Sequence, residues 1–242
     1  MIRIRISVYI NLMGIKIKRI KPRQMLASVL YRLRKLPLSN RSKFKLFLNL
    51  EWIFNRLSHE LSFEVYNSQN HPWRKQSQDF ILDFVQPEQT VLDLGCARGE
   101  ITHVIAEKAK NTIGVDHSQE FIDIAQKNYR QENLEFLCLD AVDYLKNTDK
   151  KFDILILSHI LEHIDEPKAF LENFKNFFRY IYVEVPDFDG TPLNHYHYRK
   201  DLDLPLIYSD NDHVSEFDRY ELQDLFKQCD LKILRSDYIF GI

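Results

Sequence analysis

From residue 90 onward, short apolar segments of strand length alternate five times with more polar segments, and this alternation limits the fold more than any other feature. In the intervening segments, apolar residues recur every three or four positions, which is typical of helices that pack one face on a sheet. Repeated strand–helix–strand units predict a parallel sheet wrapped by helices. We therefore expect an α/β fold with a Rossmann-like, doubly wound, mostly parallel sheet. The predicted strands are Thr90–Leu94, Thr112–Asp116, Leu134–Leu139, Phe152–Ser158 and Tyr180–Val185.

The helix ends and the last part of the chain refine this expectation. Ser118 is a predicted N-cap, and Pro167 is a predicted first-turn proline. After the fifth strand only one more is expected, at Leu231–Ile239. Either a final strand is absent, or another segment such as Ile2–Ile10 lies on that edge of the sheet. An unpaired edge would favour a homodimer.

The first strand runs into a glycine-containing turn, VLDLGCARGE from Val91 to Glu100. Ligands of such sheets bind at the carboxyl ends of the strands. Read as the dinucleotide motif G-x-G-x-x-G from Gly95, the turn would place Glu100 at a helix N-terminus facing a pyrophosphate, which is electrostatically unfavourable. Read as G-x-A-x-G from Gly95 to Gly99, it suits close approach to a nucleoside.

Four motifs in order, VLDLGCARGE, IGVDHS, LCLDAVDY and FDILILSHILEHIDEP, resemble those of the class I S-adenosylmethionine-dependent methyltransferases. The resemblance covers about residues 89–186 at the spacing of that family. It implies that S-adenosylmethionine is the cofactor.

The resemblance also implies roles for individual residues. Asp116 would accept hydrogen bonds from the two ribose hydroxyls, and Asp140 would accept one from the adenine amine. The loop glycines would let the main chain approach the cofactor closely, and Asp93 would orient the loop from below. The expected cofactor-binding residues are Asp93, Gly95, Ala97, Gly99, Asp116, His117, Asp140, Ala141 and Ser158.

Ala97 departs from the family, which usually has glycine at this position. A methyl group is tolerable if the backbone φ there is negative. The substitution then predicts weaker cofactor binding and not a loss of function.

Methyl transfer is an in-line displacement, so catalysis depends on positioning and, for a hydroxyl acceptor, on a base. Two segments outside the cofactor loop supply candidates: SHILEHI, and an insertion at about 187–216 that we expect to be a lid, because long loops in compact domains are usually functional. The expected catalytic residues are His213 as general base, with His163 and Glu162. Arg199 is expected to pair with an anionic acceptor or with an acid of the same loop.

Other interpretations of these residues stay open. Glu162 and His163 also fit a local turn, because L-E-H is frequent in the family whatever the substrate. His213 also fits a lid histidine that only hydrogen-bonds its own loop. The H-x-x-E-H run from His159, together with His213, offers three nitrogens and one oxygen to a metal such as zinc. Its spacing enforces no tetrahedral site, so we predict no metal.

The N-terminal part differs sharply in charge from the rest. Residues 1–60 contain 14 Lys and Arg against two acids, whereas the other 182 residues have a net charge of −14. Apolar spacing predicts helices at about 22–36 and 41–62, the second capped by Ser39 or Asn40. We expect a basic helical extension over residues 1–70, and a methyltransferase domain over residues 71–242.

The basic residues have two main interpretations. In the first, these side chains are simply solvated. In the second, residues 1–45 bind an anionic membrane surface, or a polyanionic or lipid-linked substrate. No nucleic acid partner is expected, because the interleaving of aromatic and basic residues typical of such modules is missing.

Composition bounds the location. The three cysteines lie far apart and form no C-x-x-C pair, which argues against a disulfide framework or a zinc knuckle. We therefore expect a cytoplasmic location, either free or at the surface of a membrane. No apolar run approaches the roughly 20 residues needed to cross a bilayer.

Together these features predict an enzyme that transfers a methyl group from S-adenosylmethionine to a small-molecule or glycan-type acceptor, at oxygen. The alternative is a non-catalytic module of the same fold that binds a partner or an anionic membrane surface. A dehydrogenase is disfavoured by Glu100 and by the missing third glycine.

Overall fold

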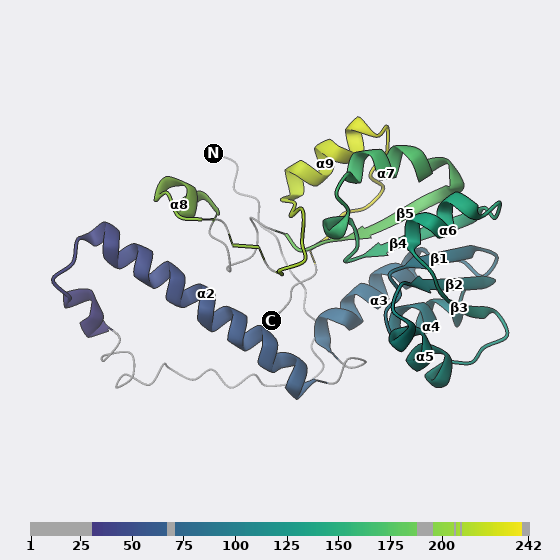
Figure 1. Ribbon diagram of the computed structural model, residues 1–242, viewed down its shortest axis with the longest axis horizontal. Helices are drawn as coiled ribbons and strands as arrows, with labels where there is room; N and C mark the ends of the chain where they lie inside the picture. Colours follow the sequence, from purple (N-terminus) through teal and green to yellow (C-terminus); the bar gives the residue numbers. More distant parts are fainter. Residues whose placement is uncertain (1–30, 67–70, 188–195, 206, 209, 239–242) are drawn as a thin grey trace. The chain divides into compact units, whose positions relative to one another are not determined.

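The computed structural model describes residues 31–66, 71–187, 196–205, 207–208 and 210–238 (Figure 1). The chain divides between residues 44 and 45 into two units, each described by itself. The predicted edge segment at residues 2–10, and the part of the first predicted helix before residue 31, lie outside the described residues. Residues 31 and 32 are helical and lead into the short 3-10 helix η1 (Leu33–Lys35).

Helix α2 (Asn40–Val65) confirms the second predicted helix and extends three residues beyond its predicted end. Its N-cap is Ser39, whose hydroxyl oxygen accepts a hydrogen bond of 3.1 Å from the Ser42 N–H. No helix among the described residues is long and apolar enough to cross a membrane.

Five parallel strands form one sheet in the order β3-β2-β1-β4-β5, which confirms the predicted α/β fold. The order reverses direction between β1 and β4, and in sheets of this kind the ligand binds at such a switch point. The strands begin and end within two residues of their predicted bounds. They are β1 (Thr90–Leu94), β2 (Asn111–Asp116), β3 (Leu134–Cys138), β4 (Phe152–Ser158) and β5 (Phe178–Glu184).

Helices cover both faces of the sheet (Figure 1). On one face, α3 and α4 contribute Ile81 and Ile105 to a buried cluster with Ile156 of β4, and α5 packs beside them. On the other face, α6, α7 and α9 bury apolar residues against Leu92 and Leu155. The helices are α3 (Pro72–Phe84), α4 (Glu100–Ala106), α5 (Gln119–Asn128), α6 (Ala141–Asn147), α7 (Pro167–Phe174), α8 (Tyr196–Asp201) and α9 (Arg219–Gln228), with 3-10 turns η2 (Leu161–His163) and η3 (Lys175–Phe177).

Both predicted helix-start signals are confirmed. The Ser118 hydroxyl accepts a hydrogen bond of 3.3 Å from the Phe121 N–H at the start of α5, and Pro167 occupies the first turn of α7. The Ser118 cap fixes the start of α5, which follows the carboxyl end of β2, where Asp116 lies.

The predicted strand at Leu231–Ile239 is wrong over its described residues, 231–238, which pair with no strand. Leu231 turns back to donate its N–H to the Phe226 carbonyl at the end of α9, at 2.9 Å. Leu234 is 63% exposed, so the apolar pattern of this segment does not form a buried face. Arg235 instead fixes the segment, with its guanidinium 4.3 Å from the centre of the Phe80 ring on α3.

Candidate active site

The loop between β1 and α4 turns through the left-handed region at three alternate residues: φ is 70° at Gly95, 46° at Ala97 and 80° at Gly99. A Cβ at Gly95 would clash with the Ile160 side chain, and one at Gly99 would lie 2.6 Å from Phe136 Cζ, so both positions require glycine. The condition stated for Ala97, a negative φ, is therefore not met. Its left-handed backbone is held from outside the loop by a hydrogen bond to Asp116.

Asp116 ends β2 and is only 7% exposed. One carboxylate oxygen accepts a hydrogen bond of 2.9 Å from the Ala97 N–H, and the other accepts one of 2.9 Å from the Ser118 N–H. Each carboxylate oxygen can accept more than one hydrogen bond, so both can also bind hydroxyls of a ligand. His117 is beside it, with Nδ1 3.8 Å from the same carboxylate and a side chain that is 87% exposed.

Asp140 lies beyond β3, next to Asp116 across the sheet, because the Leu139 N–H donates to the Asp116 carbonyl at 3.0 Å. Its Oδ1 caps α6 by accepting from Val142 and Asp143, each at 2.9 Å, and α6 itself begins at Ala141. Among the described residues no contact is made by the other oxygen of the exposed Asp140, so this oxygen can accept from a donor such as an exocyclic amine. Two neighbouring carboxylates and a tight left-handed loop fit a nucleoside, and they do not fit a phosphate.

Asp93 lies inside β1, below this loop, and is 3% exposed. Its carboxylate accepts a hydrogen bond of 2.6 Å from the Thr102 hydroxyl and so anchors the first turn of α4. Burial raises the pKa of Asp93 to about 7, against the opposing effect of that hydrogen bond. Asp93 therefore orients the loop indirectly, through the helix that follows it.

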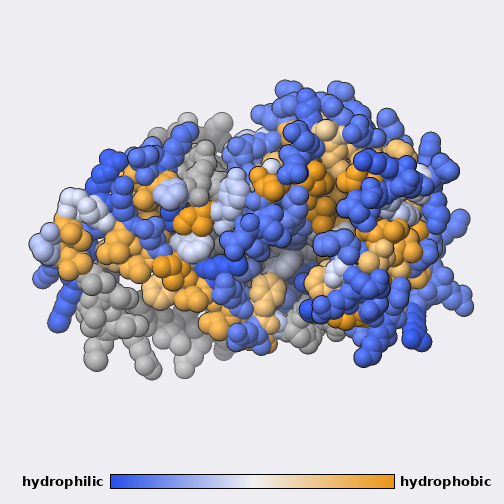
Figure 2. Space-filling view, in the orientation of Figure 1, coloured by the Kyte–Doolittle hydropathy of each residue, from blue (hydrophilic) through white to orange (hydrophobic). Residues whose placement is uncertain are grey.

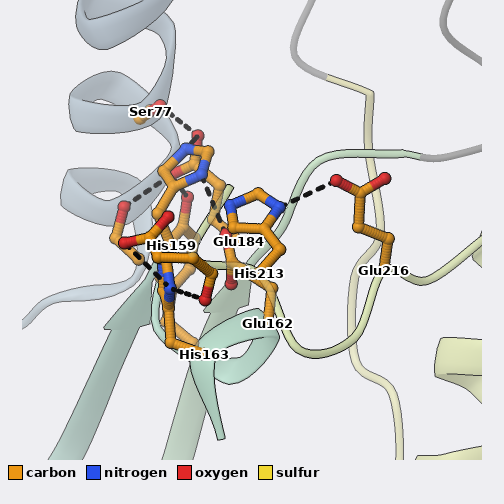
Figure 3. A network of polar contacts seen from close by, with 10 residues as sticks. Ser77, His159, Glu162, His163, Glu184, His213 and Glu216 are labelled. Atoms are coloured by element: carbon orange, nitrogen blue, oxygen red, sulfur yellow. Dashed lines mark hydrogen bonds and ion pairs between the residues drawn. The ribbon is translucent and has the colours of Figure 1, made fainter. Parts of the chain in front are cut away.

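The carboxyl ends of β4 and β5 carry a cluster of charged residues (Figure 3). His159 follows β4 with a left-handed φ of 56°, and its ring lies between two acids, 3.3 Å from Glu162 and 3.7 Å from Glu184. Glu184 ends β5 and accepts hydrogen bonds from Ser77 at 2.7 Å and from Ser158 at 3.0 Å. Ser158, expected at the cofactor, is thus tied to this cluster.

The cluster keeps His159 charged. Burial disfavours its charge, but the close carboxylates of Glu162 and Glu184 outweigh this and raise the pKa of His159 to about 9. The pKa of Glu184 is lowered, since contact with His159 and the hydroxyls of Ser77 and Tyr182 outweighs the opposing effect of burial. Glu162 is fully buried, and its carboxylate lies 3.3 Å from His159 Nδ1.

The last residues of the predicted lid pack on η2, the 3-10 turn that contains Glu162. The Glu162 carbonyl accepts the N–H groups of Val214 and Ser215, at 3.0 and 3.1 Å. This brings His213 to His163, with ring centres 4.8 Å apart and the planes nearly perpendicular. His213 Nδ1 lies 2.8 Å from a carboxylate oxygen of Glu216, and both of these side chains are buried.

The three expected catalytic residues, Glu162, His163 and His213, therefore lie together. Each offers one ligand atom, and these atoms lie within 4.8 Å of one another, so the group could hold a metal ion. Ligand atoms of one tetrahedral zinc ion lie about 3.4 Å apart, so any pair of these atoms near the 4.8 Å limit would have to move closer. The sequence-based expectation of no metal stays a prediction.

The expected pairing of Arg199 with an anionic acceptor or with an acid of its loop stays a prediction. Arg199 is 1% exposed, and its guanidinium contacts the Pro205 carbonyl and the Asn49 side chain, each at 3.4 Å. Among the described residues it pairs with no acid. Residues 188–195 of the predicted lid lie outside the described part of the chain.

Several residues of this site were missed by sequence reasoning. Glu184 carries the same signal as Asp116 and Asp140, an acid at a strand end, and Glu216 lies three residues after His213. Ser77 has no such signal, because 107 residues separate it from its partner Glu184.

Comparisons with known proteins agree with this geometry. A family model described as a methyltransferase domain matches residues 66–236. A ubiquinone biosynthesis O-methyltransferase of Coxiella burnetii is 32% identical over 85 residues, which are 34% of this chain and 36% of that protein. A protein of Invertebrate iridescent virus 6 named as a methyltransferase is 27% identical over 187 residues, 72% of this chain and 69% of that protein.

Solved structures agree on the fold. A chain from the complex between the Haloferax volcanii Trm112 methyltransferase activator and its methyltransferase has a TM-score of 0.53 and 16% identity, covering 83% of this chain and 80% of that one.

The match to the Coxiella protein spans only about a third of that relative's length. The family model, by contrast, covers more than half of this chain, and S-adenosylmethionine as the predicted cofactor agrees with it. The chain therefore belongs to the methyltransferase-domain family, within the class I S-adenosylmethionine-dependent group.

Proposed function

We propose that the protein transfers a methyl group from S-adenosylmethionine to an oxygen of a small-molecule or glycan-type acceptor. The observation that carries this proposal is the contact between the two halves of the site. Ile160 lies against Gly95 of the cofactor loop, and two residues later Glu162 binds the segment that carries His213. The cofactor loop and the candidate base are thus linked through one short turn.

The cofactor would be held by Asp116 at the ribose, by Asp140 and Ala141 at the adenine, and by the backbone of the Gly95–Gly99 loop. When bound, S-adenosylmethionine supplies a methyl group on a positively charged sulfur, which an acceptor oxygen can attack in line. The protein must then orient the acceptor and remove its proton.

His213 is the base in this proposal. The Glu216 carboxylate, 2.8 Å from His213 Nδ1, favours a proton on Nδ1 and so leaves Nε2 as the basic nitrogen. A base oriented by a buried acid is a recurrent catalytic arrangement. His159 is unsuited to this role because its pKa of about 9 keeps it protonated at neutral pH.

The choice of oxygen is supported by the name of the Coxiella relative, which records an O-methyltransferase. A small-molecule acceptor is supported by the same name, whereas a glycan-type or lipid-linked acceptor and a cytoplasmic location rest on sequence reasoning alone. The non-catalytic alternative has less support, because Asp116, Gly95 and Gly99 keep the contacts that a cofactor loop requires.

Asp116→Ala should abolish binding of S-adenosylmethionine, because it removes the ribose acceptor and the hydrogen bond that holds Ala97. Calorimetric titration with S-adenosylmethionine and S-adenosylhomocysteine measures this. Asp123→Ala, an exposed acid on α5, is the control and should bind as the wild type does. Wild-type affinity in Asp116→Ala would remove the assigned role of Asp116.

Ala97→Gly should tighten S-adenosylmethionine binding roughly fivefold, equivalent to about 1 kcal/mol, because the methyl group no longer narrows the loop. The melting temperature should change little. Relief of the left-handed alanine gains about 1 kcal/mol, and the added freedom of glycine in the unfolded chain offsets much of it. Unchanged affinity would mean that the Ala97 methyl group faces away from the cofactor.

His213→Ala should lower the rate of methyl transfer roughly 100-fold or more without changing affinity for S-adenosylhomocysteine. Transfer of labelled methyl groups to a panel of hydroxyl-bearing acceptors measures the rate. Glu216→Gln should give a smaller loss and shift the pH profile, whereas His103→Ala, on α4, should leave the rate unchanged. An equal loss in rate and in cofactor affinity would indicate a structural role for His213.

His159 should make stability depend on pH. Because its pKa in the folded chain is raised from 6.5 to about 9, its stabilising contribution is complete below pH 6.5 and is lost as the pH rises through 9. The melting temperature should therefore fall between pH 6.5 and 9.5 by more in the wild type than in His159→Gln. The exposed His117→Gln is the control. A parallel fall in His159→Gln would show that the ring is not held as a cation.

A further inference from the structure

Among the described residues, nothing covers an apolar stripe on one side of helix α2. Of the seven large apolar side chains of α2 that are between 37 and 63% exposed, five share this side, and Figure 2 shows hydrophobic residues gathered along the helix. These five are Leu46, Ile53, Phe54, Leu57 and Leu61. Monomeric proteins rarely leave contiguous apolar surface of this kind without a binding partner.

The residues of the stripe all lie on one side of the helix. Its members follow one another at helical spacing, and Leu50, which is half-buried, lies between them on the same side. The residues that α2 buries, Leu48 and Ser62, point to another side, and Ser62 contacts the buried His71 at 3.0 Å. The helix is therefore amphipathic, but its apolar side is not the one that packs on the protein.

The charge of this region indicates what covers the stripe. Residues 1–50 contain thirteen Lys and Arg and no acid, and the first acid of the chain is Glu51. Three of these basic residues, Arg41, Lys43 and Lys45, lie in the first turns of α2 itself. A second copy of the chain that packed stripe against stripe would bring like charges together, whereas an anionic lipid surface neutralises them.

We propose that α2 binds the surface of an anionic membrane, with Leu46, Ile53, Phe54, Leu57 and Leu61 entering the boundary between headgroups and acyl chains. From Leu46 to Leu61 the stripe is roughly 22 Å long, and it lies along the bilayer surface in the manner of interfacial amphipathic helices. The basic first turns contact the lipid phosphates. This inference does not depend on the proposed methyl transfer.

Flotation of the full chain with vesicles tests the proposal, using phosphatidylcholine vesicles with and without phosphatidylglycerol. Leu57→Glu should weaken partitioning into the anionic vesicles about tenfold or more relative to Ser58→Glu, since the Leu57 side chain is then no longer buried. Ser58→Glu adds the same charge to an exposed position of α2 outside the stripe. The double variant Lys43→Gln, Lys45→Gln should lose about fivefold per charge on anionic vesicles only.

Two results would overturn the proposal. One is equal partitioning of Leu57→Glu and Ser58→Glu while helical content and S-adenosylhomocysteine affinity stay as in the wild type. The other is a wild-type dimer, measured by light scattering, that Leu57→Glu converts to a monomer without change in vesicle binding. The second result would assign the stripe to contact between copies of this chain.

Discussion

The carboxylate of Asp116 is the contact on which the candidate site depends. It accepts N–H groups from the loop after β1 and from the turn after β2, and so joins two adjacent strand ends through one buried side chain. It also explains how an alanine holds a left-handed backbone at residue 97: the hydrogen bond to Asp116 offsets a conformational cost of about 1 kcal/mol. The same carboxylate is the predicted partner of the ribose, so the site is organised by the group that would bind the ligand.

A second buried feature separates the roles of the histidines. His159 is held as a cation between Glu162 and Glu184. It can therefore stabilise these two acids, but it is not suited to take a proton from an acceptor. His213 has its Nδ1 2.8 Å from the buried Glu216 carboxylate, which favours a proton on Nδ1 and leaves Nε2 as the basic nitrogen. Sequence spacing alone does not distinguish these two residues, because each has a glutamate three positions later, whereas Glu184 reaches His159 from another strand.

Much of the fold could be predicted because its signals are local. The strands are buried apolar runs, and Ser118 and Pro167 start helices through contacts within one turn. The failures involve residues distant in sequence. The backbone of Ala97 is set by Asp116, nineteen residues away. The segment after α9 has the composition of a strand, but its apolar residues find no buried face and Arg235 holds it to α3. Ser77 and Glu184 come together only in the fold.

The contact between Ile160 and Gly95 has a thermodynamic consequence. Ile160 touches the loop that would hold the methyl donor, and Glu162, in the same turn, supports the segment that would face the acceptor. If a bound donor displaces Ile160, the affinity for the acceptor changes by some factor, and the acceptor must change the affinity for the donor by the same factor. A single aliphatic side chain would then couple the binding of the two substrates.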